Sequence, residues 1–354
     1  MSRVAFVFPG QGSQAVGMGA RLAAASPAAA AVFAAADAAL GEPISRVAHE
    51  GPEDLLNQTE YAQPALLACS IAFLAALRER WASIGAEPPA PAFVAGHSMG
   101  QYSALVAAGA LDLTDAVRLV RERGRLMQRS GTGRPGRMAA IIGLDEARLP
   151  ELLARAAEQG IVGVANRNAP GQVVISGEAE AVAVATRIAR DLGAKRAIEL
   201  PVSVAAHSPL MAEAAAGMRR VLAAVAFRDP QPPLLANADA RIIATAADAR
   251  AELVEHLTTG VDWIAAVERM AAEGVSTFVE IGPGRVLTGL IRRIVPEATV
   301  LATDDRTPRT AWPSPSCPPP RRRRPPPGGA TNRAPTRLLP PRRRHRPRRH
   351  QPGR

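Results

Sequence analysis

The 354-residue sequence has only two cysteines, Cys69 and Cys317, which lie far apart and in unlike surroundings. This excludes a disulfide framework and a cysteine-based metal site, and it suits a reducing cytoplasm. The six histidines show no metal-ligand spacing, so no metal is expected. Aromatic residues make up 3% of the chain and hydrophobic residues 47%. The core must therefore consist mainly of Ala, Val, Leu and Ile.

Long apolar runs are also missing. The longest extends from Pro64 to Leu77 and is shorter than the roughly 20 residues that a membrane span requires. The run Val4 to Phe8 is too short for the core of a signal peptide and predicts a buried strand instead. We therefore expect a cytoplasmic protein without a targeting signal or a membrane partner.

Lysine is nearly absent, because Lys195 is the only lysine among 43 basic residues. The net charge of +11 arises at one end: fifteen arginines, fourteen prolines and no acidic residue follow Asp305. Residues 305–354 are predicted to be a disordered tail, since they cannot bury enough apolar surface to fold. The tail is either the product of a frameshift in a GC-rich gene or a genuine segment that binds nucleic acid or another polyanion nonspecifically. No other nucleic-acid contact is expected.

The remaining chain predicts an α/β body interrupted by a small insert. In the body we expect strands at 4–8, 91–95, 234–235 and 277–281, and helices at about 18–40, 64–81, 101–109, 114–129, 247–258 and 263–273. In the insert we expect strands at 138–143, 161–165, 172–176 and 196–201, and helices at 145–159 and 178–192. This βαββαβ order is that of a ferredoxin-like unit. We assign residues 1–130 and 203–304 to the body and 131–202 to the insert.

Gly96-His97-Ser98-Met99-Gly100 fits the pattern G-x-S-x-G. It follows a predicted strand and precedes a predicted helix, which is the context of a nucleophile elbow. In such an elbow the serine occupies a strained turn, and the amides at the start of the helix point toward developing negative charge. The alternative is a glycine-rich turn with an incidental serine. The context favours acyl-transfer chemistry at Ser98.

A serine nucleophile requires a general base. His97 is adjacent to Ser98, but neighbouring residues on a tight turn point in different directions. His207 follows the last strand of the insert, where the chain must re-enter the body, and it is the better candidate. A packed histidine without a catalytic role remains the alternative.

The helix predicted at 114–129 carries four arginines on one face, which we expect to be solvated: Arg118, Arg121, Arg125 and Arg129. Arg123 lies roughly 200° away around the helix, on the apolar face. A buried arginine must find a partner. It either forms an ion pair with an acidic residue or binds a substrate carboxylate. Helical geometry does not decide between the two.

Seven motifs occur in an order that resembles one family: Phe8-Pro9-Gly10-Gln11-Gly12-Ser13-Gln14, Gln63-Pro64-Ala65, Gly96-His97-Ser98-Met99-Gly100, Arg123-Gly124, Asn168-Ala169-Pro170-Gly171-Gln172, His207-Ser208-Pro209-Leu210-Met211 and Glu280-Ile281-Gly282-Pro283-Gly284. Over about residues 3–300 the chain resembles malonyl-CoA:acyl carrier protein transacylases of fatty-acid synthesis and the acyltransferase domains of polyketide synthases. The resemblance implies an α/β-hydrolase-like body with an inserted ferredoxin-like subdomain, a monomeric state and no cofactor. It implies malonyl-CoA and acyl carrier protein as substrate and partner.

The resemblance also implies site roles. Ser98 would be the acylated nucleophile and His207 its base, held by backbone carbonyl groups. The backbone amides of Gln11 and Met99 would form the oxyanion hole, and Arg123 would bind the malonyl carboxylate.

Three positions depart from the family pattern. Gln101 replaces a common Glu, so a hydrogen bond made there loses its charge. His256 replaces a common Gln near the active site, and we predict it among the substrate-binding residues. Ala206 precedes the histidine where many malonyl-specific relatives have Phe, which leaves room for a methyl branch. Methylmalonyl or another acyl group, and a serine esterase or thioesterase, are the alternative functions.

Overall fold

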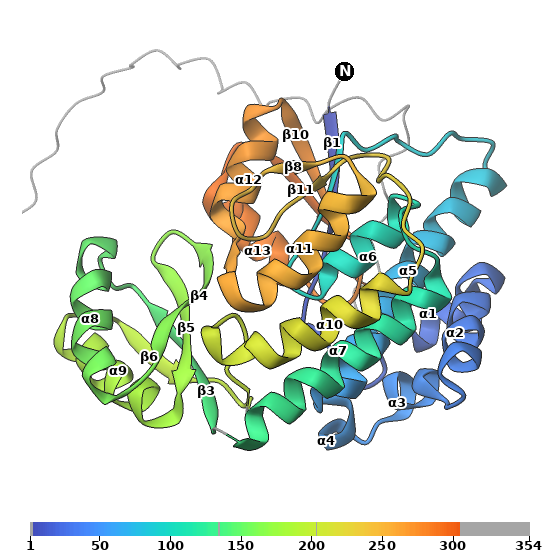
Figure 1. The fold of residues 1–354 in the computed structure, drawn as a ribbon. Coiled ribbons are helices and arrows are strands. Elements are labelled where there is room, and N and C mark those ends of the chain that lie inside the picture. Colours follow the sequence, from blue (N-terminus) through green and yellow to red (C-terminus); the bar gives the residue numbers. More distant parts are fainter. Residues whose placement is uncertain (1–2, 134, 203, 305–354) are drawn as a thin grey trace, which may run out of the picture. The chain divides into compact units, whose positions relative to one another are not determined.

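The computed structural model describes residues 3–133, 135–202 and 204–304. The predicted tail, 305–354, lies outside the described residues. Residues 3–304 form two sheets with helices around them, which confirms the predicted α/β class (Figure 1).

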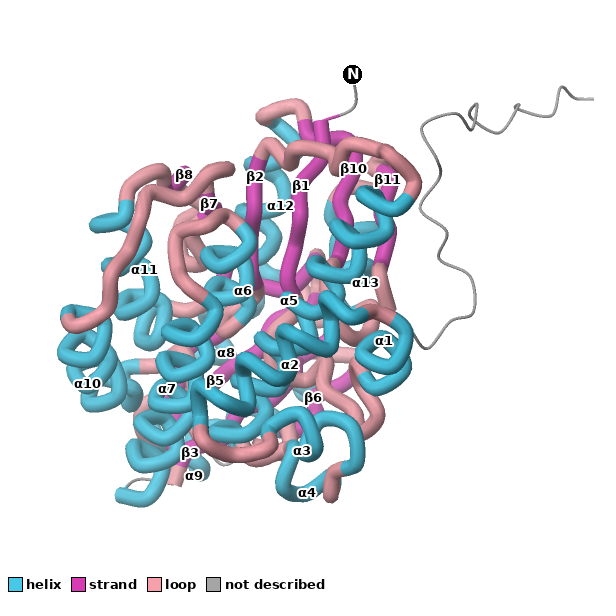
Figure 2. The backbone as a smooth tube through the Cα atoms, turned by 90° about the vertical axis from the view of Figure 1, so that its right-hand side faces the viewer, coloured by secondary structure: helices cyan, strands magenta, loops and turns pink. Residues whose placement is uncertain are grey.

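The larger sheet has the strand order β11–β10–β1–β2–β7–β8. Its strands are β1 (Arg3–Phe8), β2 (Phe93–Gly96), β7 (Leu234–Leu235), β8 (Ile242–Ile243), β10 (Val275–Glu280) and β11 (Thr299–Ala302). Neighbouring strands are parallel except for the antiparallel pair β7–β8. Figure 2 shows β11, β10, β1 and β2 side by side. Because the carboxyl ends of parallel strands meet at one edge, the loops after β1 and β2 lie together there.

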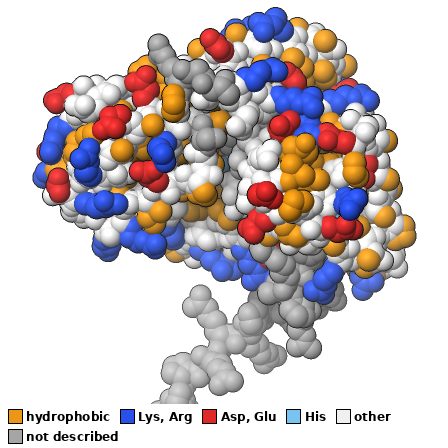
Figure 3. Space-filling view, turned by 90° about the horizontal axis from the view of Figure 1, so that it is seen from below, with side chains coloured by type: hydrophobic (Ala, Val, Ile, Leu, Met, Phe, Trp, Pro, Cys, Tyr) orange, Lys and Arg blue, Asp and Glu red, His pale blue; other side chains and the backbone are white. Residues whose placement is uncertain are grey.

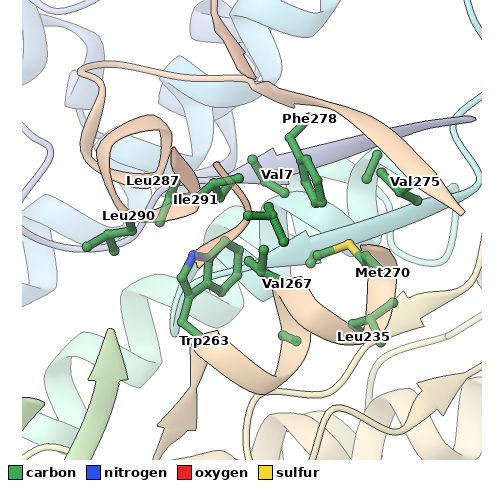
Figure 4. Close-up of a cluster of buried hydrophobic side chains, with 14 of the residues drawn as sticks. Val7, Leu235, Trp263, Val267, Met270, Val275, Phe278, Leu287, Leu290 and Ile291 are labelled. Atoms are coloured by element: carbon green, nitrogen blue, oxygen red, sulfur yellow. The ribbon is translucent and has the colours of Figure 1, made fainter. Parts of the chain in front are cut away.

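Helices cover both faces of this sheet. The helices of the body are α1 (Ala20–Ala25), α2 (Pro27–Leu40), α3 (Ile44–Glu50), α4 (Glu53–Leu56), α5 (Thr59–Ser83), α6 (Gly100–Ala107), α7 (Leu113–Gly133), α10 (Ala212–Ala223), α11 (Ala246–Thr259), α12 (Trp263–Ala272) and α13 (Val286–Ile294). Helix α6 packs on β1 and β2, and α5 packs on α6 and α7. Alternation along β1 places Ala5 and Val7 on the other face, against α12 and α13 (Figure 4). Trp263 is the largest side chain of that cluster and is fully buried.

The smaller sheet has the order β6–β3–β5–β4–β9. Its strands are β3 (Gly136–Ile142), β4 (Val162–Ala169), β5 (Gln172–Glu178), β6 (Arg196–Glu199) and β9 (Val261–Asp262), and its helices are α8 (Leu149–Ala156) and α9 (Ala179–Asp191). Among β3, β4, β5 and β6, neighbouring strands are antiparallel, and β5 lies between β3 and β4, as in a split βαβ unit. This confirms the ferredoxin-like insert. The body adds β9, which pairs in parallel with β4 and was not predicted.

Two predicted helices differ from the observed ones at a proline. The segment 18–40 forms two helices, since Pro27 disfavours helical geometry at Ser26, which instead caps α2. The segment 64–81 belongs to a longer helix, α5, that contains Pro64. Pro64 has no N–H to donate to Glu60 O, and that carbonyl accepts a hydrogen bond from Arg121 Nη1 at 2.8 Å instead.

The prediction of a fully solvated arginine face on α7 is wrong at one position. The side chains of Arg118, Arg125 and Arg129 are at least half exposed, but that of Arg121 is only 3% exposed. Arg121 forms ion pairs with Glu42 and Glu60. On the face shown in Figure 3, acidic and basic side chains are interspersed.

By length and composition alone, helix α5 is long and apolar enough to cross a membrane. The sequence did not predict this, because the uninterrupted apolar run Pro64–Leu77 is shorter than the helix. However, 72% of its most apolar window is buried inside the protein. Its apolar surface packs against α2, α6 and α7. It is therefore the central core helix of the body.

Candidate active site

Ser98 occupies a sharp turn between β2 and α6. Its φ is 52°, in the left-handed region that a residue with a side chain rarely adopts. A Cβ atom on Gly96 would lie 1.9 Å from Gly100 C, and one on Gly100 would lie 2.2 Å from Phe8 O. Strand, turn and helix can therefore approach this closely only because both glycines lack side chains. The result is the strand–turn–helix geometry predicted for a nucleophile elbow.

His207 is brought against Ser98 from a segment 109 residues away. Its Nε2 lies 2.9 Å from Ser98 Oγ. Its Nδ1–H donates to the backbone oxygen of His256 at 2.6 Å, which leaves Nε2 free to accept the serine proton. His207 itself has a φ of 60°. Both members of the pair thus have strained backbones, which is a common property of reacting residues.

The environment keeps His207 neutral. Burial, reinforced by the positive charge of Arg123, lowers the pKa of His207 to about 3. The hydrogen bond to the His256 carbonyl opposes this shift only in part. A neutral imidazole that accepts from a serine hydroxyl is the protonation state required of a general base.

Arg123 is the second group that contacts Ser98. Its guanidinium is 1% exposed. It donates to three neutral acceptors: Gln63 Oε1 at 2.8 Å, Ser98 Oγ at 3.1 Å and His256 Nε2 at 3.1 Å. Its Nε has no partner within the described part of the chain. None of these partners carries a negative charge, so the arrangement does not match an ion pair with an acidic residue.

His256 lies next to Arg123 and His207 and does not line the cavity at Ser98. Its Nδ1–H donates to Glu252 O at 2.9 Å, so Nε2 is the acceptor that meets Arg123. Burial and the charge of Arg123 lower its pKa well below the ordinary value. Its contacts are thus with Arg123 and, through its backbone oxygen, with His207.

A cavity of about 310 Å³ opens beside these residues. Ser98, Arg123 and His207 line it together with Gln11 and Met99. The backbone N–H groups of Gln11 and Met99 make no hydrogen bond to an acceptor in the described ranges. Two free donors from adjacent loops are therefore available beside the serine. The Gln11 side chain accepts from Thr59 Oγ1 at 2.6 Å, which orients the first loop.

The insert supplies the opposite wall of the cavity, including Met138, Asn166 and Leu200. A hydrogen bond links the two walls of the cavity: the Nε2–H of His97 donates to Asn168 Oδ1 at 2.9 Å. His97 thus makes this contact, and among the described residues its ring has no hydrogen bond to Ser98.

Asn237 contributes to the site but was not singled out in the sequence, whereas Gln63 and Asn168 lie in two of the seven motifs without a role having been predicted for them. Asn237 follows β7 at the carboxyl edge of the sheet, and its Oδ1 accepts from Ser98 N at 2.8 Å. A polar residue close behind a buried strand is the signal that could have identified it. Among the residues described, no group of three or more His, Cys, Asp or Glu side chains is arranged to hold a metal ion.

Comparison with known proteins gives consistent findings. The family model of the acyl transferase domain matches residues 5–308. The chain is 47% identical over 305 residues to malonyl CoA-acyl carrier protein transacylase of Escherichia coli K12, covering 86% of this chain and 97% of that protein. It superposes with a TM-score of 0.80 on the acyl-carrier-protein S-malonyltransferase of Bartonella henselae, at 44% identity and with 85% and 95% of the two chains covered. A malonyl-transacylase in complex with its type II polyketide-synthase acyl carrier protein also matches, with a TM-score of 0.80, 44% identity and coverage of 86% and 97%.

Proposed function

Since the chain belongs to the family of acyl transferase domains, we propose that it transfers a malonyl group from coenzyme A to the phosphopantetheine thiol of an acyl carrier protein. The product is an extender unit for fatty-acid or polyketide synthesis. The choice of malonyl as the acyl group rests on Arg123. This residue is a buried cation beside the nucleophile, and its protein partners are all neutral.

The first half-reaction acylates the enzyme. Ser98 Oγ attacks the thioester carbonyl carbon, and His207 Nε2 accepts the serine proton. The backbone N–H groups of Gln11 and Met99 stabilise the oxyanion. The C–S bond then breaks, the proton moves from His207 to the departing sulfur, and coenzyme A leaves as the free thiol.

The second half-reaction reverses these roles. The phosphopantetheine thiol gives its proton to His207 Nε2 and attacks the Ser98 ester. The bond between Ser98 Oγ and the acyl carbon breaks, and the proton returns to Ser98. This is a ping-pong cycle that consumes no oxidant, reductant or metal.

Arg123 binds the free carboxylate of the malonyl group. A guanidinium can form two parallel hydrogen bonds to a carboxylate, and these are strong where water is excluded. His256 positions this guanidinium through its Nε2 and does not itself contact the substrate. A plain esterase has no use for a buried cation beside its serine.

Methylmalonyl is the second candidate acyl group. Ala206 lines the cavity next to His207, and its small side chain leaves space beside the acyl α-carbon. We further propose that the protein acts as a cytoplasmic monomer without a cofactor.

Transfer to a carrier protein tests the proposal. Holo acyl carrier protein is incubated with the enzyme and malonyl-, methylmalonyl- or acetyl-CoA, and its mass is followed. We expect malonyl to be the preferred acyl group and hydrolysis to be slow relative to transfer. Rapid hydrolysis of small esters with no acylated carrier protein would instead identify an esterase.

A further inference from the structure

A buried polar cluster lies behind the elbow, on the side away from the cavity. At its centre is Glu252 of α11, whose side chain is fully buried. One carboxylate oxygen, Oε1, accepts two hydrogen bonds: from Asn237 N at 2.7 Å and from Gln101 Nε2 at 3.1 Å. The transfer mechanism above makes no use of this carboxylate.

Both partners of Glu252 hold the backbone of the elbow. Asn237 Oδ1 accepts from Ser98 N at 2.8 Å, and Asn237 Nδ2 donates to Gly96 O at 2.8 Å. Gln101 Oε1 accepts from Gly96 N at 3.0 Å. Three backbone groups of the strained turn are therefore hydrogen-bonded to the side chains of Asn237 and Gln101. Both of these residues in turn donate a hydrogen bond to the carboxylate of Glu252.

A turn with a φ of 52° at Ser98 persists only where its surroundings fix it. We propose that Glu252 is a positioning residue for the nucleophile: by holding Asn237 and Gln101, it fixes the Ser98 turn in the geometry that presents Oγ to His207. This rests on the proposed function in one respect, that Ser98 is the acylated residue.

The amide of Gln101 supplies the hydrogen-bond donor that the carboxylate of Glu252 requires. Residue 101 must accept from Gly96 N and, with its other terminal atom, donate to both Leu235 O and Glu252 Oε1. An amide does this, whereas an ionised carboxylate cannot donate and would repel Glu252. Arg241 Nη2 lies 3.8 Å from the other oxygen of Glu252 and supplies partial charge compensation. Glutamine at position 101 is therefore what permits the buried carboxylate on α11.

The test compares Glu252→Ala with Glu252→Gln. Alanine leaves Asn237 N and Gln101 Nε2 without an acceptor, whereas the amide oxygen of glutamine still accepts from both. The matched control is Glu280→Ala. Glu280 is an equally buried carboxylate that accepts from Leu287 N and Thr288 N, and its side chain makes no hydrogen bond to the elbow within the described part of the chain.

Three readouts are needed: the thermal midpoint, kcat and KM for malonyl-CoA, and the rate at which a fluorophosphonate labels Ser98. For Glu252→Ala we expect kcat and the labelling rate to fall about ten- to a hundredfold with KM nearly unchanged. Glu252→Gln should recover most of both rates. Glu280→Ala should lose thermal stability but keep both rates.

Equal rate losses in Glu252→Ala and Glu280→Ala would overturn the proposal, since Glu252 would then act only through global stability. Unchanged rates in Glu252→Ala would overturn it as well. The labelling rate reports on Ser98 without any acyl substrate. A wild-type protein that is labelled but transfers no malonyl group would therefore contradict the proposed function and still test the role of Glu252.

Discussion

The guanidinium of Arg123 donates to the hydroxyl of Ser98 across 3.1 Å. Arg123 lies on α7 and Ser98 lies in the turn before α6, and both line the same cavity. We expect a cation in contact with the nucleophile to select for an acyl group that carries an anion close to its carbonyl carbon. Malonyl has its carboxylate one carbon away from the thioester, and acetyl has none.

Replacing Arg123 should therefore change selectivity more than stability. In Arg123→Ala we expect kcat/KM for malonyl-CoA to fall at least about a hundredfold, because a charge-assisted bidentate contact is lost, while acetyl transfer changes little. Arg121→Ala is the matched control, since Arg121 is a buried arginine on the same helix that pairs with Glu42 and Glu60. The control should lose stability without changing the malonyl-to-acetyl ratio. Equal losses of kcat/KM for malonyl-CoA and acetyl-CoA in Arg123→Ala would show that Arg123 does not bind the malonyl carboxylate.

The acid limb of the pH–rate profile should lie far below that of an ordinary histidine. Burial and the charge of Arg123 lower the pKa of His207 from 6.5 to about 3, so the neutral base is present throughout the range above that value. We expect kcat/KM for malonyl-CoA to be insensitive to His207 between about pH 5 and 8. The measurement is a pH–rate profile, with circular dichroism at each pH to verify folding. A midpoint near 6.5 would show that His207 is solvated in the working enzyme.

Stability should fall as the pH drops below about 6.5. The folded-state pKa values of His97, His207 and His256 are all lowered from 6.5, mainly by burial. The unfolded chain therefore binds protons that the folded chain does not, and the stabilisation that is complete above pH 6.5 is lost on acidification.

His256→Gln removes one of these three groups. Below pH 6.5 we expect the slope of its unfolding free energy against pH to be shallower than that of the wild type, by up to about 1.4 kcal/mol per pH unit. Urea denaturation at pH 7, 6 and 5 measures both slopes, and pH 8 gives the baseline at which no histidine is charged. Parallel curves would mean that His256 is protonated in the folded state.

The elbow should not tolerate a methyl group at Gly100. A Cβ there would lie 2.2 Å from Phe8 O, which is fixed backbone of the central strand. We expect Gly100→Ala to be inactive and strongly destabilised. Gly289→Ala is the control: it lies within α13 and nothing is within 4 Å of the added carbon. The control should gain about 0.5–1 kcal/mol of stability and keep its activity.

The parts of the fold that were predictable from sequence are those with a local signal. The elbow at Ser98 was predictable because its two glycines and its serine lie within one short motif, Gly96 to Gly100. The four-strand insert followed from strand and helix patterns of ordinary length. Strands β8 and β9 have two residues each, so they carry no periodicity, and β9 also depends on pairing with the distant strand β4.

Side-chain partners were much less predictable. The spacing along α7 placed Arg121 and Arg123 on different faces and predicted burial for Arg123, but it did not predict that Arg121 is buried as well. Arg121 is covered by acidic residues of other segments, and Arg123 meets Gln63 from 60 positions away. Likewise Glu252 approaches Gln101 across 151 positions. Such contacts arise from the packing of α5, α6, α7 and α11, which no sequence window contains.

We propose that Ser98 carries the malonyl group between coenzyme A and acyl carrier protein. Intact mass, measured after brief incubation of the wild type and of Ser98→Ala with malonyl-CoA, is the decisive experiment. We expect one malonyl adduct on the wild type, discharged by holo acyl carrier protein, and no adduct on Ser98→Ala. An adduct of equal amount on Ser98→Ala, or none on the wild type, would show that Ser98 is not the acylated residue.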